Sequence, residues 1–138
     1  MIRLATSDDL PRLMEIGTKF WGLSPLSKFI PMDEVAVCAT IEKCIANGGC
    51  FVGEHGVVMG IITEHWAAPS HKVAIELAWY GYGEGDDLLA AFEAWAKESG
   101  AIGVQMSTIG AAHDGKIEKK LVEHGYTVAE RGLFKRII

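Results

Sequence analysis

The chain has 138 residues, of which 49% are apolar and 22% charged, the length and composition of one globular domain spanning residues 1–138. No apolar run approaches the roughly 20 residues of a membrane span, and no export signal precedes the first strand, so we expect a cytoplasmic protein. The net charge of -5 argues against a nucleic-acid partner and favours a cationic one, such as an amine or a lysine-bearing protein.

The first part of the chain predicts a strand and two helices. Residues 2–6 form a short apolar strand, and Thr6 with Asp9 resembles a capping arrangement for a helix that ends near Gly22. Residues 22–32 contain two prolines and predict a loop, after which Asp33 opens a second helix that stops at residues 47–49. Three cysteines without C-x-x-C spacing indicate reduced core thiols rather than disulfides or a metal site: Cys38, Cys44 and Cys50.

The middle of the chain predicts three strands followed by a helix. Residues 50–54 and 57–66 form a hairpin, and residues 72–80 follow as a third strand after the Pro69-Ser70 break. Strict alternation in that strand puts Glu76 on one face with Ala74, Ala78 and Tyr80, and Trp79 on the other. The helix covers residues 86–99 and stops at Gly100.

The last third predicts a strand over residues 101–107, a short helix over 115–124 and a closing hairpin over 126–138, with its turn at Arg131-Gly132. The full order is β-α-α-β-β-β-α-β-α-β-β. This order predicts an α/β fold: a mixed, mostly antiparallel sheet with helices on both faces.

The loop before the third helix predicts an anion site. Gly81, Gly83 and Gly85 can take positive φ and let a ligand approach the backbone, and amides at a helix N-terminus favour a diphosphate. A plain glycine-rich turn is the alternative. Asp86 and Asp87 follow directly, and they either cap the helix or point outward and leave the amides free.

Several stretches together resemble the GNAT family of acyl-CoA-dependent N-acyltransferases. These stretches are IRLATSDDLPRL at the start, YGYGEG before Leu88 and Leu89, and LVEHGYTVAERGLFKRI near the end. The resemblance implies an acyl-CoA N-acyltransferase fold, acetyl-CoA as acyl donor, and an amine of a small molecule or protein as acceptor. The resemblance leaves a homodimer open. We expect no metal, because the five histidines form no ligand cluster at a suitable spacing.

The resemblance also implies which residues bind coenzyme A. The pantetheine arm would run beside Leu77, Ala78 and Trp79, and the diphosphate would lie on the loop and the helix start. The loop residues are Tyr80, Gly81, Tyr82, Gly83, Glu84, Gly85, Asp86 and Asp87. Tyr80 departs from the glutamine or arginine usual in the family.

For catalysis, Glu76 is the first candidate for the base, because it is a charged residue between small ones beside the cofactor channel. The alternative is that Glu76 is an edge-exposed or salt-bridged glutamate. Glu64 and His65 are second candidates. The family's tyrosine acid is replaced by Leu121, so the proton for the leaving thiolate would come from Ser107, Thr108, His113 or solvent. These departures keep open an alternative, a GNAT-shaped binding or regulatory module without transfer chemistry.

Overall fold

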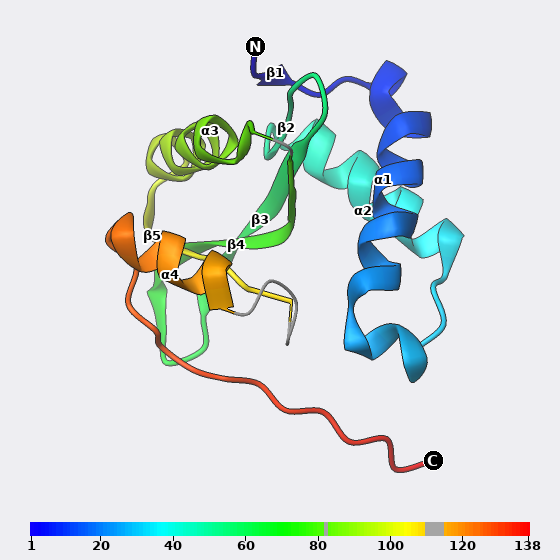
Figure 1. Ribbon diagram of the computed structural model, residues 1–138. Helices are drawn as coiled ribbons and strands as arrows, with labels where there is room; N and C mark the ends of the chain where they lie inside the picture. The colour runs from blue at the N-terminus through cyan, green and yellow to red at the C-terminus, as the bar shows by residue number, and fades with distance from the viewer. Residues whose placement is uncertain (82, 110–114) are drawn as a thin grey trace.

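A five-stranded sheet in the order β1-β2-β3-β4-β5 forms the centre of the protein in the computed structural model, which describes residues 1–81, 83–109 and 115–138 (Figure 1). The strands are β1 (Arg3–Leu4), β2 (Cys50–Val52), β3 (Val57–His65), β4 (Ala68–Tyr80) and β5 (Ala101–Gln105). Neighbouring strands are antiparallel except β4 and β5, which are parallel. The mixed, mostly antiparallel sheet is as predicted.

Four α-helices and two short 3-10 turns complete the described fold. The helices are α1 (Leu10–Leu23), α2 (Glu34–Ala46), α3 (Gly85–Glu98) and α4 (Lys116–Glu123), and the turns are η1 (Ser7–Asp9) and η2 (Pro25–Lys28). The Asp33 carboxylate accepts a hydrogen bond from the Ala36 N–H at 3.0 Å, which confirms it as the N-cap of α2.

Asp9 fixes the junction between β1 and α1. Its carboxylate accepts two hydrogen bonds from the Arg3 guanidinium, at 2.7 and 2.8 Å, and one from the Thr6 N–H at 2.8 Å. These partners, the Arg3 guanidinium first, lower the pKa of Asp9 to about 2. The predicted Thr6 and Asp9 arrangement is therefore confirmed, and it also ties the first strand to the first helix.

The sheet carries a separate apolar core on each face. The first core, between the sheet and α1 with α2, contains Leu13, Ile41, Val52 and Val57. The second core, between the sheet and α3, contains Val58, Ala74, Leu88 and Phe92. Helices therefore cover both faces of the sheet, as predicted (Figure 1). Cys44 and Cys50 are buried free thiols as expected, whereas Cys38 is half-buried.

A β-bulge at Leu77 corrects the predicted facing of β4. Met59 pairs with Ala78 and Gly60 with Glu76, so Leu77 has no partner on β3 and the alternation shifts by one residue. Trp79 consequently packs with Ala74 on the α3 face, while Tyr80 packs on the α1 and α2 face. The prediction that Glu76 and Trp79 face opposite sides was wrong, because strict alternation does not survive an extra residue.

Two further predictions from the sequence were wrong: the start of β4 and the final hairpin. β4 begins at Ala68 rather than residue 72, because Pro69 lies in the strand beside the hairpin turn, where a missing N–H is tolerated. The predicted hairpin over 126–138 does not form, and residues 127–138 are extended and exposed. Figure 1 shows this segment running away from the sheet.

Candidate functional site

The candidate site lies where β4 and β5 separate. Their parallel pairing ends at Ile75 and Gln105, yet β4 continues for five residues to Tyr80. One hydrogen bond spans the two segments just beyond this point, from the Ser107 N–H to Glu76 Oε1 at 3.1 Å. The structure therefore brings together two of the predicted catalytic residues, Glu76 and Ser107.

Glu76 is a buried carboxyl group on the α3 face of the sheet, with 6% of its surface exposed. Desolvation raises its pKa to about 7, although the Ser107 N–H works in the opposite direction. Gly60 lies opposite it on β3, and a Cβ there would be 2.5 Å from Phe92 Cζ. The missing side chain at Gly60 lets the Phe92 ring pack against the sheet beside Glu76. A carboxyl group whose pKa lies near neutral pH can take or give a proton.

The loop after β4 is held by the side chain of Trp79, a residue predicted to contact the cofactor through its backbone. The Trp79 indole N–H donates to the Gly85 carbonyl at 3.1 Å and fixes the first turn of α3. Of the three glycines that can take positive φ in this loop, only Gly83 does, at 73°. At Gly81 the absence of a side chain leaves room for Leu88 instead, because a Cβ at Gly81 would lie 3.3 Å from Leu88 Cδ1.

The acidic side chains at this loop are held by other elements. Glu84 accepts hydrogen bonds from the Glu54 and His55 N–H groups, both at 2.7 Å, in the turn between β2 and β3. Its pKa is lowered, chiefly by the His55 N–H. Glu84 is the N-cap residue of α3 but makes no side-chain capping bond.

Asp86 is paired with α4. Its Oδ1 lies 2.8 Å from Lys120 Nζ and 3.4 Å from His124 Nε2, and the Lys120 hydrogen bond is the main reason that its pKa is lowered. Asp86 therefore follows the outward option, and α4 compensates its charge. Asp87 is exposed in the same turn. The sequence analysis missed Lys120 and His124, although both follow at helical spacing, i and i+4, on a short helix.

The remaining predicted residues divide into those near the site and those away from it. Leu77 forms the bulge and is partly exposed, while the adjacent Ala78 is buried. Glu64 and His65 lie at the far end of β3, four and five residues beyond Gly60, which at the usual strand rise is roughly 15 Å from Glu76. Leu121 is buried as an apolar residue. Tyr82 and His113 fall outside the described residues.

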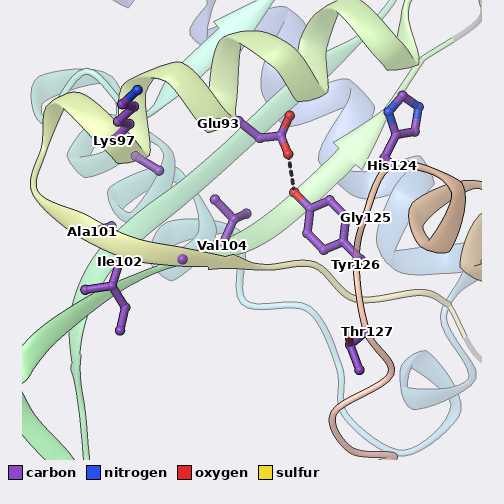
Figure 2. Close-up of a pocket in the computed structure, with 11 residues that line it drawn as sticks. Glu93, Lys97, Ala101, Ile102, Val104, His124, Gly125, Tyr126 and Thr127 are labelled. Atoms are coloured by element: carbon purple, nitrogen blue, oxygen red, sulfur yellow. Dashed lines mark hydrogen bonds between the residues drawn. The ribbon is translucent and has the colours of Figure 1, made fainter.

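A cavity separate from Glu76 lies on the other side of β5. It has a volume of about 480 Å³ and lies between α3, β5 and residues 124–127 (Figure 2). Across it, the Tyr126 hydroxyl donates to Glu93 Oε2 at 3.0 Å. Because it lacks Glu76 and the glycine loop, we do not assign the candidate chemistry to this cavity.

Within the described residues, no helix is long and apolar enough to cross a membrane, and no group of three or more acidic, histidine or cysteine side chains is placed to hold a metal. No protein-family model matches the chain, and no curated protein matches it in sequence. Solved structures do match it over its full length.

An aminoglycoside N-acetyltransferase, AAC(6')-Iy in complex with a bisubstrate analogue of coenzyme A, matches with a TM-score of 0.70 at 17% identity, over 100% of this chain and 97% of that one. A ribosomal-protein-alanine N-acetyltransferase from Brucella melitensis matches with a TM-score of 0.66 at 12% identity, over 100% and 99%. The chain has the GNAT fold. A transcriptional regulator from Bacillus halodurans also shares this GNAT fold, with a TM-score of 0.69 at 18% identity, over 99% of each chain.

Proposed function

We propose that this GNAT-fold protein transfers an acetyl group from acetyl-CoA to an amine of a small molecule or protein, with Glu76 as the general base. The observation that carries the proposal is the position of Glu76: a buried carboxyl group at the point where β4 and β5 separate, oriented by the Ser107 N–H. Two structures of one GNAT-fold neighbour, AAC(6')-Iy bound to a bisubstrate analogue and bound to coenzyme A, support a thioester donor of this class.

The proposed donor site uses the residues between Leu77 and Asp87. The glycine loop with the start of α3 offers backbone amides to the diphosphate, and Leu77, Ala78 and Trp79 flank the pantetheine arm. The outward pairing of Asp86 with Lys120 supports this assignment, because it takes a negative charge away from the helix mouth. Glu84 is likewise engaged, by the Glu54 and His55 N–H groups, so two of the three carboxylates at this loop have other partners.

The proposed reaction needs one base and one donor for the oxyanion. The amine nitrogen attacks the thioester carbonyl, its proton passes to the Glu76 carboxylate directly or through water, and the carbon–sulfur bond breaks. The backbone N–H near Ala78 stabilises the oxyanion. The departing thiolate takes a proton from Ser107, Thr108, His113 or solvent. Glu76 suits the base role because its pKa of about 7 leaves it half-ionised at neutral pH.

Glu76→Gln tests the base directly. The amide can still accept the Ser107 hydrogen bond, but it cannot take a proton, so we expect turnover to fall roughly 10²- to 10⁴-fold with acetyl-CoA affinity unchanged. Turnover would be measured by free-thiol release over a panel of amines, and affinity by thermal stabilisation with acetyl-CoA. In the wild type, kcat/KM should rise with pH through about 7, following ionisation of Glu76.

Glu98→Gln is the matched control, since Glu98 is an exposed glutamate at the end of α3, outside the proposed site. It should leave both readouts unchanged. Turnover that survives in Glu76→Gln would rule Glu76 out as the base. The alternative, a binding or regulatory module, is favoured by Leu121 in place of the family's tyrosine and by the regulator that shares the fold. It predicts no stabilisation by acetyl-CoA even at millimolar concentration.

A further inference from the structure

The turn between β2 and β3, residues 53–56, lies at the end of the sheet where β4 leads into the glycine loop and α3 (Figure 1). Val57, directly after the turn, pairs with Tyr80, the last residue of β4. A Cβ at Gly56 would lie 2.5 Å from the Tyr80 carbonyl oxygen and 2.7 Å from Gly81 Cα. The backbone of the turn therefore lies directly against the start of the loop, and the missing side chain at Gly56 permits this approach.

Two charged side chains bind this turn, one through its N–H groups and one through its carbonyl groups. The Glu84 carboxylate accepts hydrogen bonds from the Glu54 and His55 N–H groups, both at 2.7 Å. The Arg12 guanidinium, on α1, donates to the Gly53 and Glu54 carbonyls at 2.9 and 2.8 Å. Each of these bonds has one ionised partner, which makes it stronger than a bond between neutral groups. The turn thus connects α1 to the loop before α3.

Glu84 reaches the turn because Gly53 has no side chain. A Cβ at Gly53 would lie 2.2 Å from Glu84 Oε2 and 2.6 Å from its Cδ. The contact also draws the Glu84 carboxylate away from its own helix, since Glu84 is the N-cap residue of α3 but makes no side-chain capping bond. A side-chain cap would occupy an N–H group of the first turn. Glu84 therefore leaves the first N–H groups of α3 to other partners.

We propose that Glu84 is a positioning residue for the acyl donor: its contact with the β2–β3 turn holds the glycine loop in the conformation that offers the first amides of α3 to the diphosphate. The side chain acts through the loop and does not touch the donor. This inference rests on the proposed function, but the effect on the loop can be measured without any ligand. A loop already in its binding conformation binds more tightly, because less ordering is needed on binding.

Two variants break the contact from its two ends. Glu84→Ala removes the carboxylate. Gly53→Ala keeps Glu84 but places a methyl group where the carboxylate lies, and a flexible side chain can move aside at little cost to the fold. Calorimetry should show acetyl-CoA affinity falling roughly tenfold in each variant, as expected if the free loop spends about a tenth of its time in the binding conformation.

The double variant and the kinetics separate positioning from other roles. Glu84→Ala combined with Gly53→Ala should bind acetyl-CoA no more weakly than either single variant, because both changes break the same contact. With an amine substrate, KM for acetyl-CoA should rise while kcat stays unchanged, since a bound donor itself holds the loop in place.

Hydrogen exchange of the ligand-free protein measures the loop directly. The Leu88 N–H donates to the Glu84 carbonyl at 3.0 Å, and the Trp79 indole N–H donates to the Gly85 carbonyl at 3.1 Å. Both groups therefore report whether the loop keeps its place. They should exchange roughly tenfold faster in Glu84→Ala and in Gly53→Ala, whereas the backbone amides of β3 should keep their protection.

Glu54→Gln is the matched control, because the Glu54 side chain is 79% exposed and only its backbone takes part in these contacts. It should leave affinity and exchange unchanged. Unchanged exchange at Leu88 and Trp79, unchanged affinity despite faster exchange, or additive losses in the double variant would overturn the proposal. A wild type that binds no acetyl-CoA, with faster exchange in both variants, would instead defeat the proposed acetyl transfer and confirm that Glu84 holds the loop.

Discussion

At the scale of single residues, Glu76 makes the stability of the protein depend on pH. Its pKa is raised from 4.5 to about 7, so the native state binds this proton more tightly than the unfolded chain does. The stability that this contributes is complete below about pH 4.5 and is lost as pH rises through about 7. We expect the free energy of unfolding to fall by up to roughly 3 kcal/mol over this range from Glu76 alone.

Glu76→Gln should remove this part of the pH dependence, because the amide does not titrate. Urea unfolding of both proteins below about pH 5 and above about pH 8 measures the effect: the variant should gain on the wild type at the higher pH. If the free energy of unfolding changed equally with pH in the two proteins, the Glu76 carboxyl group would be hydrated in solution. This readout needs no substrate and is therefore independent of the proposed activity.

At the scale of secondary structure, the packing of α3 on the sheet depends on Gly60 in β3. A Cβ at Gly60 would lie 2.3 Å from the Ile75 carbonyl oxygen and 2.5 Å from Phe92 Cζ. We expect Gly60→Ala to destabilise the fold by at least about 1–3 kcal/mol, since backbone or α3 must shift. Gly22→Ala is the control: nothing lies within 4 Å of its Cβ position in α1, so it should be neutral or stabilising. Equal midpoints of urea unfolding for the wild type and Gly60→Ala would contradict this prediction.

The secondary structure also shows what the sequence could and could not predict. The helices and the hairpin of β2 and β3 followed from apolar periodicity and turn residues. The face of the sheet on which Trp79 lies could not be predicted in this way. It depends on the bulge at Leu77, and so on how β3 pairs with β4, which no local pattern encodes. The position of Asp86 likewise depends on Lys120, 34 residues further along the chain. The final hairpin was predicted from local propensity alone, which does not specify the strand it pairs with.

At the scale of the whole molecule, the two cores should unfold together. They lie on opposite faces of one sheet, and adjacent β3 residues belong to different cores: Val57 to the first and Val58 to the second. Both cores share the strands of this sheet, so the loss of either helical layer would also destabilise the core on the opposite face. We therefore expect a single cooperative transition. Phe92→Ala in the second core should cost roughly 3–5 kcal/mol and Leu13→Ala in the first roughly 2–5 kcal/mol.

Each substitution should shift the same transition. Far-UV circular dichroism and tryptophan fluorescence would follow it, since Trp21 lies on α1 and Trp95 on α3, where it packs 5.4 Å from the Phe92 ring. The two signals should coincide for the wild type and for both variants at a fixed protein concentration, because dimerisation would make the midpoint depend on concentration. Two separate transitions, with Phe92→Ala moving only one of them, would show that α1 with α2 and α3 are independent units joined by the sheet.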